Sequence, residues 1–243
     1  MTRMVPSKTL SLEQFLASQT VLSRRSILDL IRKKAISIDG NCVHSLKASV
    51  MPKQSVVCVE GKRVVWSFPF VYYRFYKPKG VLTTLSDPKD RPALKACISG
   101  IPEPVFPVGR LDKNTSGLLL LTNDGHFSNR IAHPSYSISK VYDVTVSNPL
   151  SKNDLRRLSL GLFLDDGPVQ FDVLDCLDRT RLTVSLSEGR NRIVRRAFDC
   201  LGYEVRKLKR LSIGPFQLGN LKEGRFKRIS KKELLGFYDS PSF

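Results

Sequence analysis

The residues from Gly109 to Gly125 form the stretch of this sequence whose side chains suggest an active site. They have the sequence GRLDKNTSGLLLLTNDG and place one carboxylate, Asp112, between the cations Arg110 and Lys113, ahead of an apolar run. Neighbouring positive charge favours the ionised form of a carboxylate. Asp112 is therefore predicted to act as a nucleophile or a base and not as a proton donor.

A buried strand is predicted to position this carboxylate. Leu118 to Leu121 form a short apolar run bounded by Gly117 and by Asn123-Asp124-Gly125, a pattern typical of a buried strand that ends in a hairpin turn. Asp112 then lies in the loop before the strand, where a rigid element can hold a reacting group. The alternative is that Asp112 and Asn114 are turn residues whose side chains bond the nearby backbone.

The charge of the chain indicates a polyanionic partner. The 243 residues include 40 Lys and Arg against 22 Asp and Glu, a formal net charge of +18, which is more than solubility requires. Residues 1–66 carry 11 basic and 4 acidic side chains, and residues 190–243 carry 14 and 5. The sequence has no apolar run near the roughly 20 residues of a spanning helix and no signal or lipidation motif. We therefore expect a nucleic acid partner, no membrane partner and a cytoplasmic location.

The sequence suggests neither a metal nor an organic cofactor. Its five cysteines and three histidines lack the spacing of a disulfide framework or a zinc site. The glycine-rich fingerprints of dinucleotide and nucleoside triphosphate sites are missing, as is the zinc-deaminase pattern. We therefore expect the site to work without a metal and without a cofactor.

The first part of the chain predicts two short helices followed by short strands. Apolar residues recur at helical spacing after Ser11 and Ser23, which are suitable N-caps, and segments that end at Asp39-Gly40 and Glu60-Gly61 have the pattern of strands with turns. Five cations lie on or beside the second helix: Arg24, Arg25, Arg32, Lys33 and Lys34. A basic helix can dock on phosphates, although a solvated helix face would carry the same charges.

This order of helices, cations and turn resembles the S4-type RNA-binding domain, through SRR at Ser23 to Arg25 and LIRKKAISIDG at Leu30 to Gly40. The remaining chain resembles a family of ribosomal RNA pseudouridine synthases, the small-ribosomal-subunit-synthase-like family, whose members carry an S4 domain in front. The motifs that carry this resemblance fall in the family order: RFYKPKGVLTT from Arg74, the Asp112 motif, HPS from His133, SKVYDVTV from Ser139, and LSEGRNRIVRRAFDCLGYEVRKLKRLSIGPFQLGNLKEG from Leu186. The resemblance implies an S4 domain at 1–66, a linker at 67–71 and a catalytic domain at 72–243.

The resemblance also implies roles for single residues. Asp112 corresponds to the family's essential aspartate, Tyr142 to the tyrosine that packs against the target ring, and Arg195 to the arginine that pairs with the aspartate. Arg110 corresponds to the arginine that fills the gap left by an extruded base, and Leu186 to a leucine that lines the pocket.

Several of these residues also have an ordinary structural interpretation. Tyr142 lies in an alternating run, where a tyrosine is commonly a half-buried strand residue. The cations after Leu186 are expected to bind RNA or to form a solvated helix face: Arg190, Arg192 and Arg196. Lys207, Lys209 and Arg210 are expected to be phosphate contacts at most.

The implied fold is α+β, a small α/β S4 unit followed by a catalytic domain with a mostly antiparallel, curved sheet and a cleft on one face. The implied reaction is isomerisation of a uridine to pseudouridine in ribosomal RNA, after the base leaves its stack. The expected partner is ribosomal RNA or a pre-ribosomal particle, bound by a monomer. EGRNR, HPS and DGP at Asp166 to Pro168 resemble the branch of the family that acts on large-subunit RNA, and this resemblance favours a large-subunit target. A small-subunit target, a non-catalytic RNA-binding protein and a glycosylase that releases uracil are the alternatives.

Overall fold

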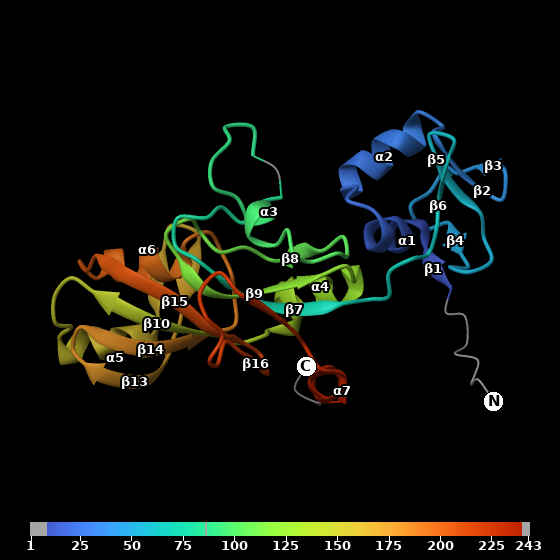
Figure 1. Ribbon diagram of the computed structural model, residues 1–243. Helices are drawn as coiled ribbons and strands as arrows, with labels where there is room; N and C mark the ends of the chain where they lie inside the picture. The colour runs from blue at the N-terminus through green and yellow to red at the C-terminus, as the bar shows by residue number, and fades with distance from the viewer. Residues whose placement is uncertain (1–8, 86, 240–243) are drawn as a thin grey trace. The chain divides into compact units, whose positions relative to one another are not determined.

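The computed structural model describes residues 9–85 and 87–239 and divides the chain into two compact units. The first unit comprises the chain up to Tyr72 together with Ile101–Phe106 and Thr122–Phe127. The second comprises Tyr73–Gly100, Pro107–Leu121 and the chain from Ser128 onward. Figure 1 shows the helices and strands of both units along the chain. Residues 1–8 and 240–243, at the outer ends of the predicted domains, lie outside the described residues.

Two helices and two small sheets build the first unit. Helix α1 (Leu12–Gln19) begins after Ser11, and α2 (Arg24–Arg32) begins after Ser23; each serine side chain accepts a hydrogen bond from the backbone three residues on, so both predicted N-caps are confirmed. The first sheet pairs β1 (Leu10–Ser11) with β4 (Ser49–Val50). The second is antiparallel, in the order β3-β2-β5-β6: β3 (Asn41–Cys42), β2 (Ile36–Ile38), β5 (Val57–Val59) and β6 (Lys62–Val64).

The helices cover this second sheet through a continuous apolar core. Leu12, Phe15 and Leu16 from α1 and Ile27 from α2 pack with Ile36 of β2 in one buried cluster. These helical residues recur at the three- and four-residue spacing of one helix face, which is why the sequence pattern predicts the two helices correctly.

A nine-stranded sheet runs through the second unit, with the strand order β13-β14-β10-β15-β9-β7-β17 and with β16 beside β15 and β8 beside β9. The registers pair β15 with β9 in parallel, and the pairs β10–β14, β10–β15, β13–β14, β15–β16 and β7–β17 are antiparallel. The bounds are β7 (Tyr72–Lys77), β8 (Phe106–Val108), β9 (Ser116–Thr122), β10 (Lys140–Val146), β13 (Asp172–Asp178), β14 (Arg181–Leu186), β15 (Val205–Ile213), β16 (Phe216–Gln217) and β17 (Phe226–Arg228). The predicted α+β class with a mostly antiparallel sheet is confirmed.

The remaining elements are a short hairpin and six helical segments. The hairpin pairs β11 (Leu162–Leu164) with β12 (Gly167–Val169). The helical segments are α3 (Leu94–Cys97), α4 (Gly125–Ala132), the 3-10 turn η1 (Pro134–Tyr136), α5 (Lys152–Leu160), α6 (Ile193–Cys200) and α7 (Lys231–Asp239). Leu158 of α5 and Phe198 of α6 join Val144 of β10 and Val184 of β14 in one buried core. Over the described residues, no helix is both long and apolar enough to cross a membrane.

The predicted hairpin turn after the apolar run is wrong. Leu118 to Leu121 do form the buried strand β9, but helix α4 follows it at Gly125. The physical reason is Asp124, whose Oδ1 accepts hydrogen bonds from the backbone N–H groups of His126 and Phe127 at 2.9 and 3.3 Å. An aspartate in this position satisfies the first donors of a helix, and the same residue type also favours turns.

Candidate active site

The loop that carries Asp112 is held by hydrogen bonds to its backbone from Leu111 to Thr115. Each of the five backbone carbonyls from Leu111 to Thr115 accepts a hydrogen bond. The donors, in order along the loop, are Thr83 Oγ1, Thr115 N, Gly80 N, Arg195 Nη2 and Lys77 Nζ, at 2.6, 3.0, 2.7, 2.7 and 2.9 Å. A loop fixed in this way presents its side chains in a defined position, which is what a catalytic group requires.

Two of these donors are cations that the fold withdraws from water. Lys77, the last residue of β7, is fully buried, and its Nζ also donates to Pro78 O at 2.8 Å. Burial lowers the pKa of Lys77 to about 8, and the nearby negative charge of Asp112 opposes that lowering. Burial likewise lowers the pKa of Arg195 in α6, again against the charge of Asp112. Both cations therefore act on Asp112 electrostatically while they hold its loop.

Arg195 does not form the direct ion pair with Asp112 that the resemblance implies. Its guanidinium donates through Nη1 to Val205 O at 2.8 Å and through Nη2 to Asn114 O at 2.7 Å. Among the described residues, the salt bridges within 4.0 Å do not include the Asp112 and Arg195 pair. In this structure Arg195 positions the loop after Asp112 and contributes its charge from a distance.

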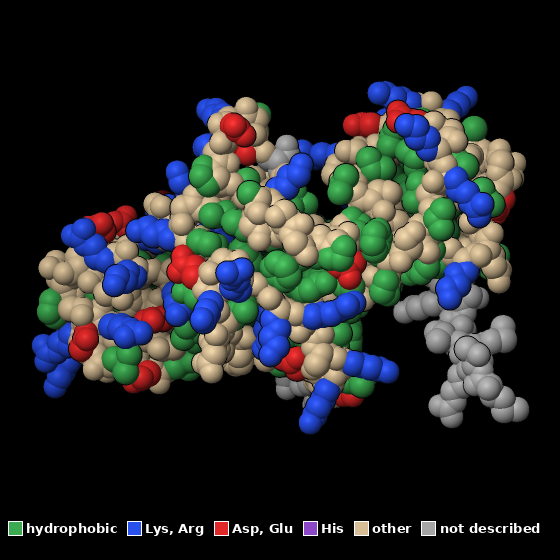
Figure 2. All heavy atoms as spheres, viewed as in Figure 1, with side chains coloured by type: hydrophobic (Ala, Val, Ile, Leu, Met, Phe, Trp, Pro, Cys, Tyr) green, Lys and Arg blue, Asp and Glu red, His purple; other side chains and the backbone are tan. Residues whose placement is uncertain are grey.

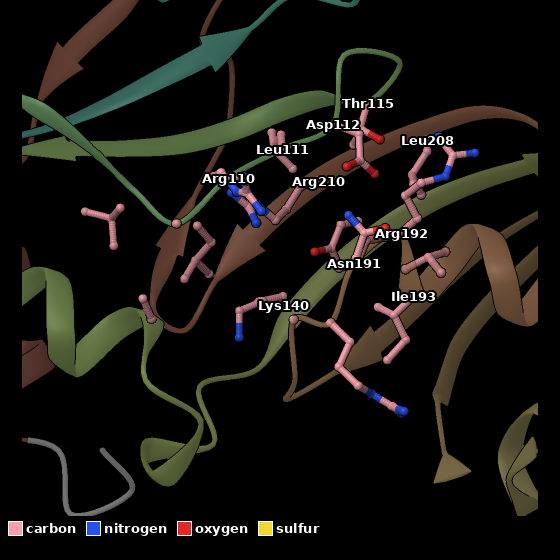
Figure 3. Close-up of a pocket in the computed structure, with 18 of the residues that line it drawn as sticks. Arg110, Leu111, Asp112, Thr115, Lys140, Asn191, Arg192, Ile193, Leu208 and Arg210 are labelled. Carbon is pink, nitrogen blue, oxygen red and sulfur yellow. The ribbon is translucent and has the colours of Figure 1, made fainter. Parts of the chain in front are cut away.

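Asp112 lies at a pocket of about 280 Å³ inside the second unit. Figure 3 shows Asp112 and Thr115 from the loop before β9, Arg210 from β15, Lys140 from β10, and Asn191 and Arg192 from the loop before α6 around this cavity. Apolar side chains complete the lining, among them Ile131, Leu208 and Ile213. A cavity with apolar walls, one carboxylate and several cations suits a small planar polar group carried on a negatively charged chain.

Tyr142 and Leu186 differ in their relation to this pocket. Tyr142 is a buried strand residue that also lines the pocket, so the structure combines the two interpretations of this position. Leu186 is not among the pocket-lining residues and instead joins the core cluster that contains Tyr142. In the register of β14 and β10 it lies opposite Lys140.

The arginines of the α6 segment fall into two groups. Arg190 pairs with Asp166 at 2.7 Å and with Glu188, and also donates to Pro168 O at 2.6 Å. Arg196 pairs with the other Asp166 oxygen at 2.7 Å. These two guanidinium groups fasten the β11–β12 hairpin, so the expected RNA contacts at both positions compete with protein contacts already made.

Arg192 and Arg110 present their charge to solvent at the pocket. Arg192 caps α6 in the left-handed region, with φ 47° and ψ 28°, a conformation that costs a non-glycine residue roughly 1–2 kcal/mol. Arg110 is exposed in the loop before β9. Both arginines line the pocket that Asp112 also lines. The strained backbone at Arg192 is of a kind often found at functional sites.

The five cations predicted on the first unit are all exposed but differ in their partners. Arg24 forms an ion pair with Glu13, and Arg32 pairs with Asp29 at 3.2 Å. Arg25, Lys33 and Lys34 have no ion-pair partner among the described residues. Figure 2 shows Lys and Arg side chains spread over the face in view.

Sequence reasoning missed three buried or half-buried cations: Lys77, Lys140 and Arg210. Arg210, expected to be a phosphate contact at most, is only 4% exposed on β15 and lines the pocket. For Lys77 and Lys140 the signal was present in the alternation of β7 and β10, because Lys77 follows the inward-facing Tyr73 and Phe75 at two-residue spacing and Lys140 precedes Tyr142 at the same spacing. Over the part of the chain that is described, no group of His, Cys, Asp and Glu side chains forms a metal site.

Comparison with known proteins gives the same family along the chain. The profile of RNA pseudouridylate synthase matches residues 71–199. The chain is 38% identical over 228 residues to an "Uncharacterized RNA pseudouridine synthase" of Aquifex aeolicus (92% of this chain, 91% of the relative). It is 37% identical over 230 residues to "Ribosomal large subunit pseudouridine synthase B" of Bacillus subtilis (92% and 93%). It is 31% identical over 230 residues to "Ribosomal small subunit pseudouridine synthase A" of Pasteurella multocida (93% and 98%).

A solved structure agrees with these sequence relatives. The crystal structure of a pseudouridylate synthase superposes with a TM-score of 0.65 at 29% identity and covers 93% of this chain and 98% of its own. The profile spans more than half of the chain, and the sequence relatives span nearly all of it. The chain that holds Asp112 at this pocket therefore belongs to the RNA pseudouridylate synthase family and is an RNA pseudouridine synthase.

Proposed function

We propose that this enzyme converts one uridine of large-subunit ribosomal RNA to pseudouridine, with Asp112 as its catalytic carboxylate. The observation that carries the assignment of Asp112 is the loop itself, whose five successive carbonyls are all hydrogen-bonded while its carboxylate faces the pocket. The large-subunit target is supported by the Bacillus subtilis relative, which is more similar to this chain than the Pasteurella multocida relative named for the small subunit.

The pocket residues suit the steps of this isomerisation. The reaction breaks the bond between C1′ of the ribose and N1 of uracil and forms a bond from C1′ to C5. An ionised Asp112 traps or stabilises the electron-poor sugar while the ring is detached. Tyr142 offers its ring to the base, and Arg110 at the rim enters the space that the base leaves in the RNA stack.

The first unit contributes RNA affinity in this proposal, as an S4-type domain at residues 1–66. Its support is the exposed cation set on and after α2, of which Arg25, Lys33 and Lys34 have no ion-pair partner among the described residues. Exposed cations of this kind bind phosphates without reading sequence. Arg192 serves the same purpose at the pocket, where it is exposed beside Asn191.

The target is tested by mapping pseudouridine in ribosomal RNA from cells that lack this gene and from cells complemented with it. Carbodiimide modification followed by reverse transcription gives a stop at each pseudouridine. We expect one stop in large-subunit RNA that is lost in the deletion strain, returns with the wild-type gene, and does not return with Asp112→Asn. A lost stop confined to small-subunit RNA would refute the large-subunit target, and an unchanged map of both RNAs would refute the ribosomal substrate.

A further inference from the structure

Arg210 is placed at the base of the pocket by the sheet. In the register of β10 and β15, Arg210 lies directly opposite Tyr142, and a bulge at this point leaves Leu211 without a partner in β10. Cross-strand partners project their side chains to the same face of a sheet. On the other side of β15, Arg210 is paired with Gly117 of β9, which has no side chain to occupy the space. The guanidinium is therefore directed between Tyr142 and the strand that follows Asp112.

One end of this guanidinium lacks a hydrogen-bond partner in the part of the protein that the structure describes. Arg210 Nε donates to Leu118 O at 2.8 Å, whereas Nη2 is buried and has no hydrogen-bond partner among the described residues. The hydroxyl of Thr115, a second residue of the pocket lining, is likewise buried and has no hydrogen-bond partner among the described residues. A buried polar atom without a partner is costly, so its presence at a pocket indicates a group that is bound there during function.

Lys140 brings a second cation to the same face. It lies two residues before Tyr142 on β10 and lines the pocket, with Nζ donating to Ile138 O at 2.8 Å. Burial, and after it the charge of Arg210, lower the pKa of Lys140 to about 8, while Glu188 opposes the change. Arg210 and Lys140 are therefore close enough to repel each other, and an anion or a polarised oxygen between them would relieve that repulsion.

Arg210 and Lys140 are less exposed to solvent than the pocket cations that suit a phosphate. Arg110 and Arg192 are exposed at the pocket, where a hydrated phosphate can meet them without losing its water. Arg210 is 4% exposed, beside the apolar Leu208 and Ile213. Apolar walls with hydrogen-bond donors between them suit a flat ring with carbonyl oxygens better than they suit a phosphate.

We propose that Arg210 Nη2 and Lys140 Nζ bind the carbonyl oxygens of the target uracil and stabilise the negative charge of the ring while it is detached. When the bond from C1′ to N1 breaks, its electron pair leaves with the ring and spreads over N1, O2 and O4. The pair on the ring then forms the bond from C5 to C1′, the proton on C5 leaves to water, and N1 takes up a proton from water, so that the product is neutral. This assignment rests on the proposed role of the Asp112 pocket, and the two cations act as fixed donors where charge develops.

Lys140→Met is the main test, because it removes the charge without taking away a contact to β9. Single-turnover conversion of a target RNA is expected to slow by on the order of 10²-fold, the cost of losing one such donor, while the dissociation constant for RNA changes less than about threefold. Arg210→Lys, which can still donate to Leu118 O, is expected to slow the same step. Exposed Lys152→Met in α5 is the matched control and keeps the wild-type rate. A wild-type rate for Lys140→Met, or a loss explained by weaker RNA binding, would overturn the proposal.

A pH profile separates a charged role from a structural one. The charged groups around the pocket are Arg110 and Asp112 before β9, Glu188, Arg190 and Arg192 before α6, and Arg210 on β15. Lys77 of β7, which donates to the Asp112 loop, also has a pKa of about 8. The wild-type rate is expected to fall as pH rises through about 8, where Lys140 loses its proton. Lys140→Arg stays charged, so its fall is expected at higher pH. An identical fall in both proteins would assign the titration to another group and overturn the role of Lys140.

An RNA whose target base is a better leaving group tests whether Lys140 stabilises the detached ring. Fluorine at C5 makes the detached uracil a weaker base, so the ring needs less stabilisation by the protein. With 5-fluorouridine at the target position, cleavage of the original glycosidic bond in Lys140→Met is expected to lie closer to the wild-type rate than with uridine. An equal deficit with both RNAs would show that Lys140 does not stabilise the detached ring. If folded wild-type protein does not convert uridine, the proposed function itself is refuted. That outcome differs from a failure of the Lys140 and Arg210 proposal alone, in which wild type is active and Lys140→Met is equally active.

Discussion

At the residue scale, the central feature is one carboxylate surrounded by cations that are held by the backbone. Lys77 and Arg195 both interact electrostatically with Asp112, and both donate hydrogen bonds to the loop that carries it. Arg210 acts in turn on Lys77 and Lys140. Since these charges are fixed before RNA binds, they need no rearrangement when the sugar and the base change their charge.

Lys77 gives a prediction for the pH dependence of stability. Its pKa of about 8 in the folded chain lies below its ordinary value of 10.5, so between these values the unfolded chain holds a proton that the folded chain has lost. Stability rises with pH wherever the unfolded state binds more protons. The thermal midpoint of wild type relative to Lys77→Met is therefore expected to increase from pH 8 to 10.5 and to stay constant below pH 8. A constant difference across the whole range would contradict the lowered pKa.

At the element scale, the site depends on the close parallel approach of β9 and β15. Gly117 has φ 107°, and a Cβ atom there would lie 2.3 Å from the carbonyl oxygen of Arg210 and 2.5 Å from its nitrogen. Glycine adopts this backbone conformation without strain. Because Gly117 has no side chain, β9, which follows the Asp112 loop, can lie close beside β15, which carries Arg210.

Gly117→Ala is expected to destabilise the protein by at least about 2 kcal/mol, because left-handed backbone strain adds to a clash with backbone that cannot move aside. In a protein of this size the thermal midpoint should fall by roughly 4–8 °C. Gly236→Ala is the matched control: it lies in α7 with no atom within 4 Å of the added Cβ, and alanine favours helices. Equal midpoints for the two variants would contradict the role of Gly117.

Local patterns predict part of this arrangement. The apolar run from Leu118 to Leu121 predicts a buried strand, and Ser11 and Ser23 predict two helix starts, because these signals lie within a few residues. The pattern at Asp124 indicates a hairpin turn where the structure has a helix start, because aspartate favours turns and helix caps alike.

Other features depend on contacts between distant parts of the chain. The pairing of Gly117 with Arg210 joins residues far apart in the sequence, so no local pattern shows that Arg210 reaches the pocket. For the same reason no local pattern predicts the placement of Leu186 in the core or the contact of Arg195 with Asn114. The family resemblance identifies Asp112 and Tyr142 as candidates, and the fold brings both to one pocket.

At the scale of the whole molecule, a net charge of +18 favours an RNA partner through the release of counterions. The ion pairs divide this charge into cations already engaged by carboxylates and cations that remain available. On and directly after α2 the available ones, among the described residues, are Arg25, Lys33 and Lys34.

Replacing these three residues by Gln is expected to weaken RNA binding and to reduce its salt dependence. The slope of log K against log salt concentration should become shallower by up to about 2, at about 0.7 for each phosphate that the protein no longer neutralises. Arg24→Gln with Arg32→Gln is the matched control, since both side chains already pair with carboxylates. A slope unchanged in the triple variant, measured by filter binding between roughly 50 and 200 mM salt, would contradict an RNA-binding role for α2.

The most direct test of Asp112 is the release of tritium from ribosomal RNA labelled at C5 of uracil, since the new bond to C1′ displaces that hydrogen. Wild type is expected to release tritium from a large-subunit transcript or precursor particle, and Asp112→Asn is expected to be slower by at least about a thousandfold, as for loss of a catalytic nucleophile. Asp175→Asn, an exposed carboxylate on β13, should match wild type. Release by Asp112→Asn at the wild-type rate would contradict the central claim.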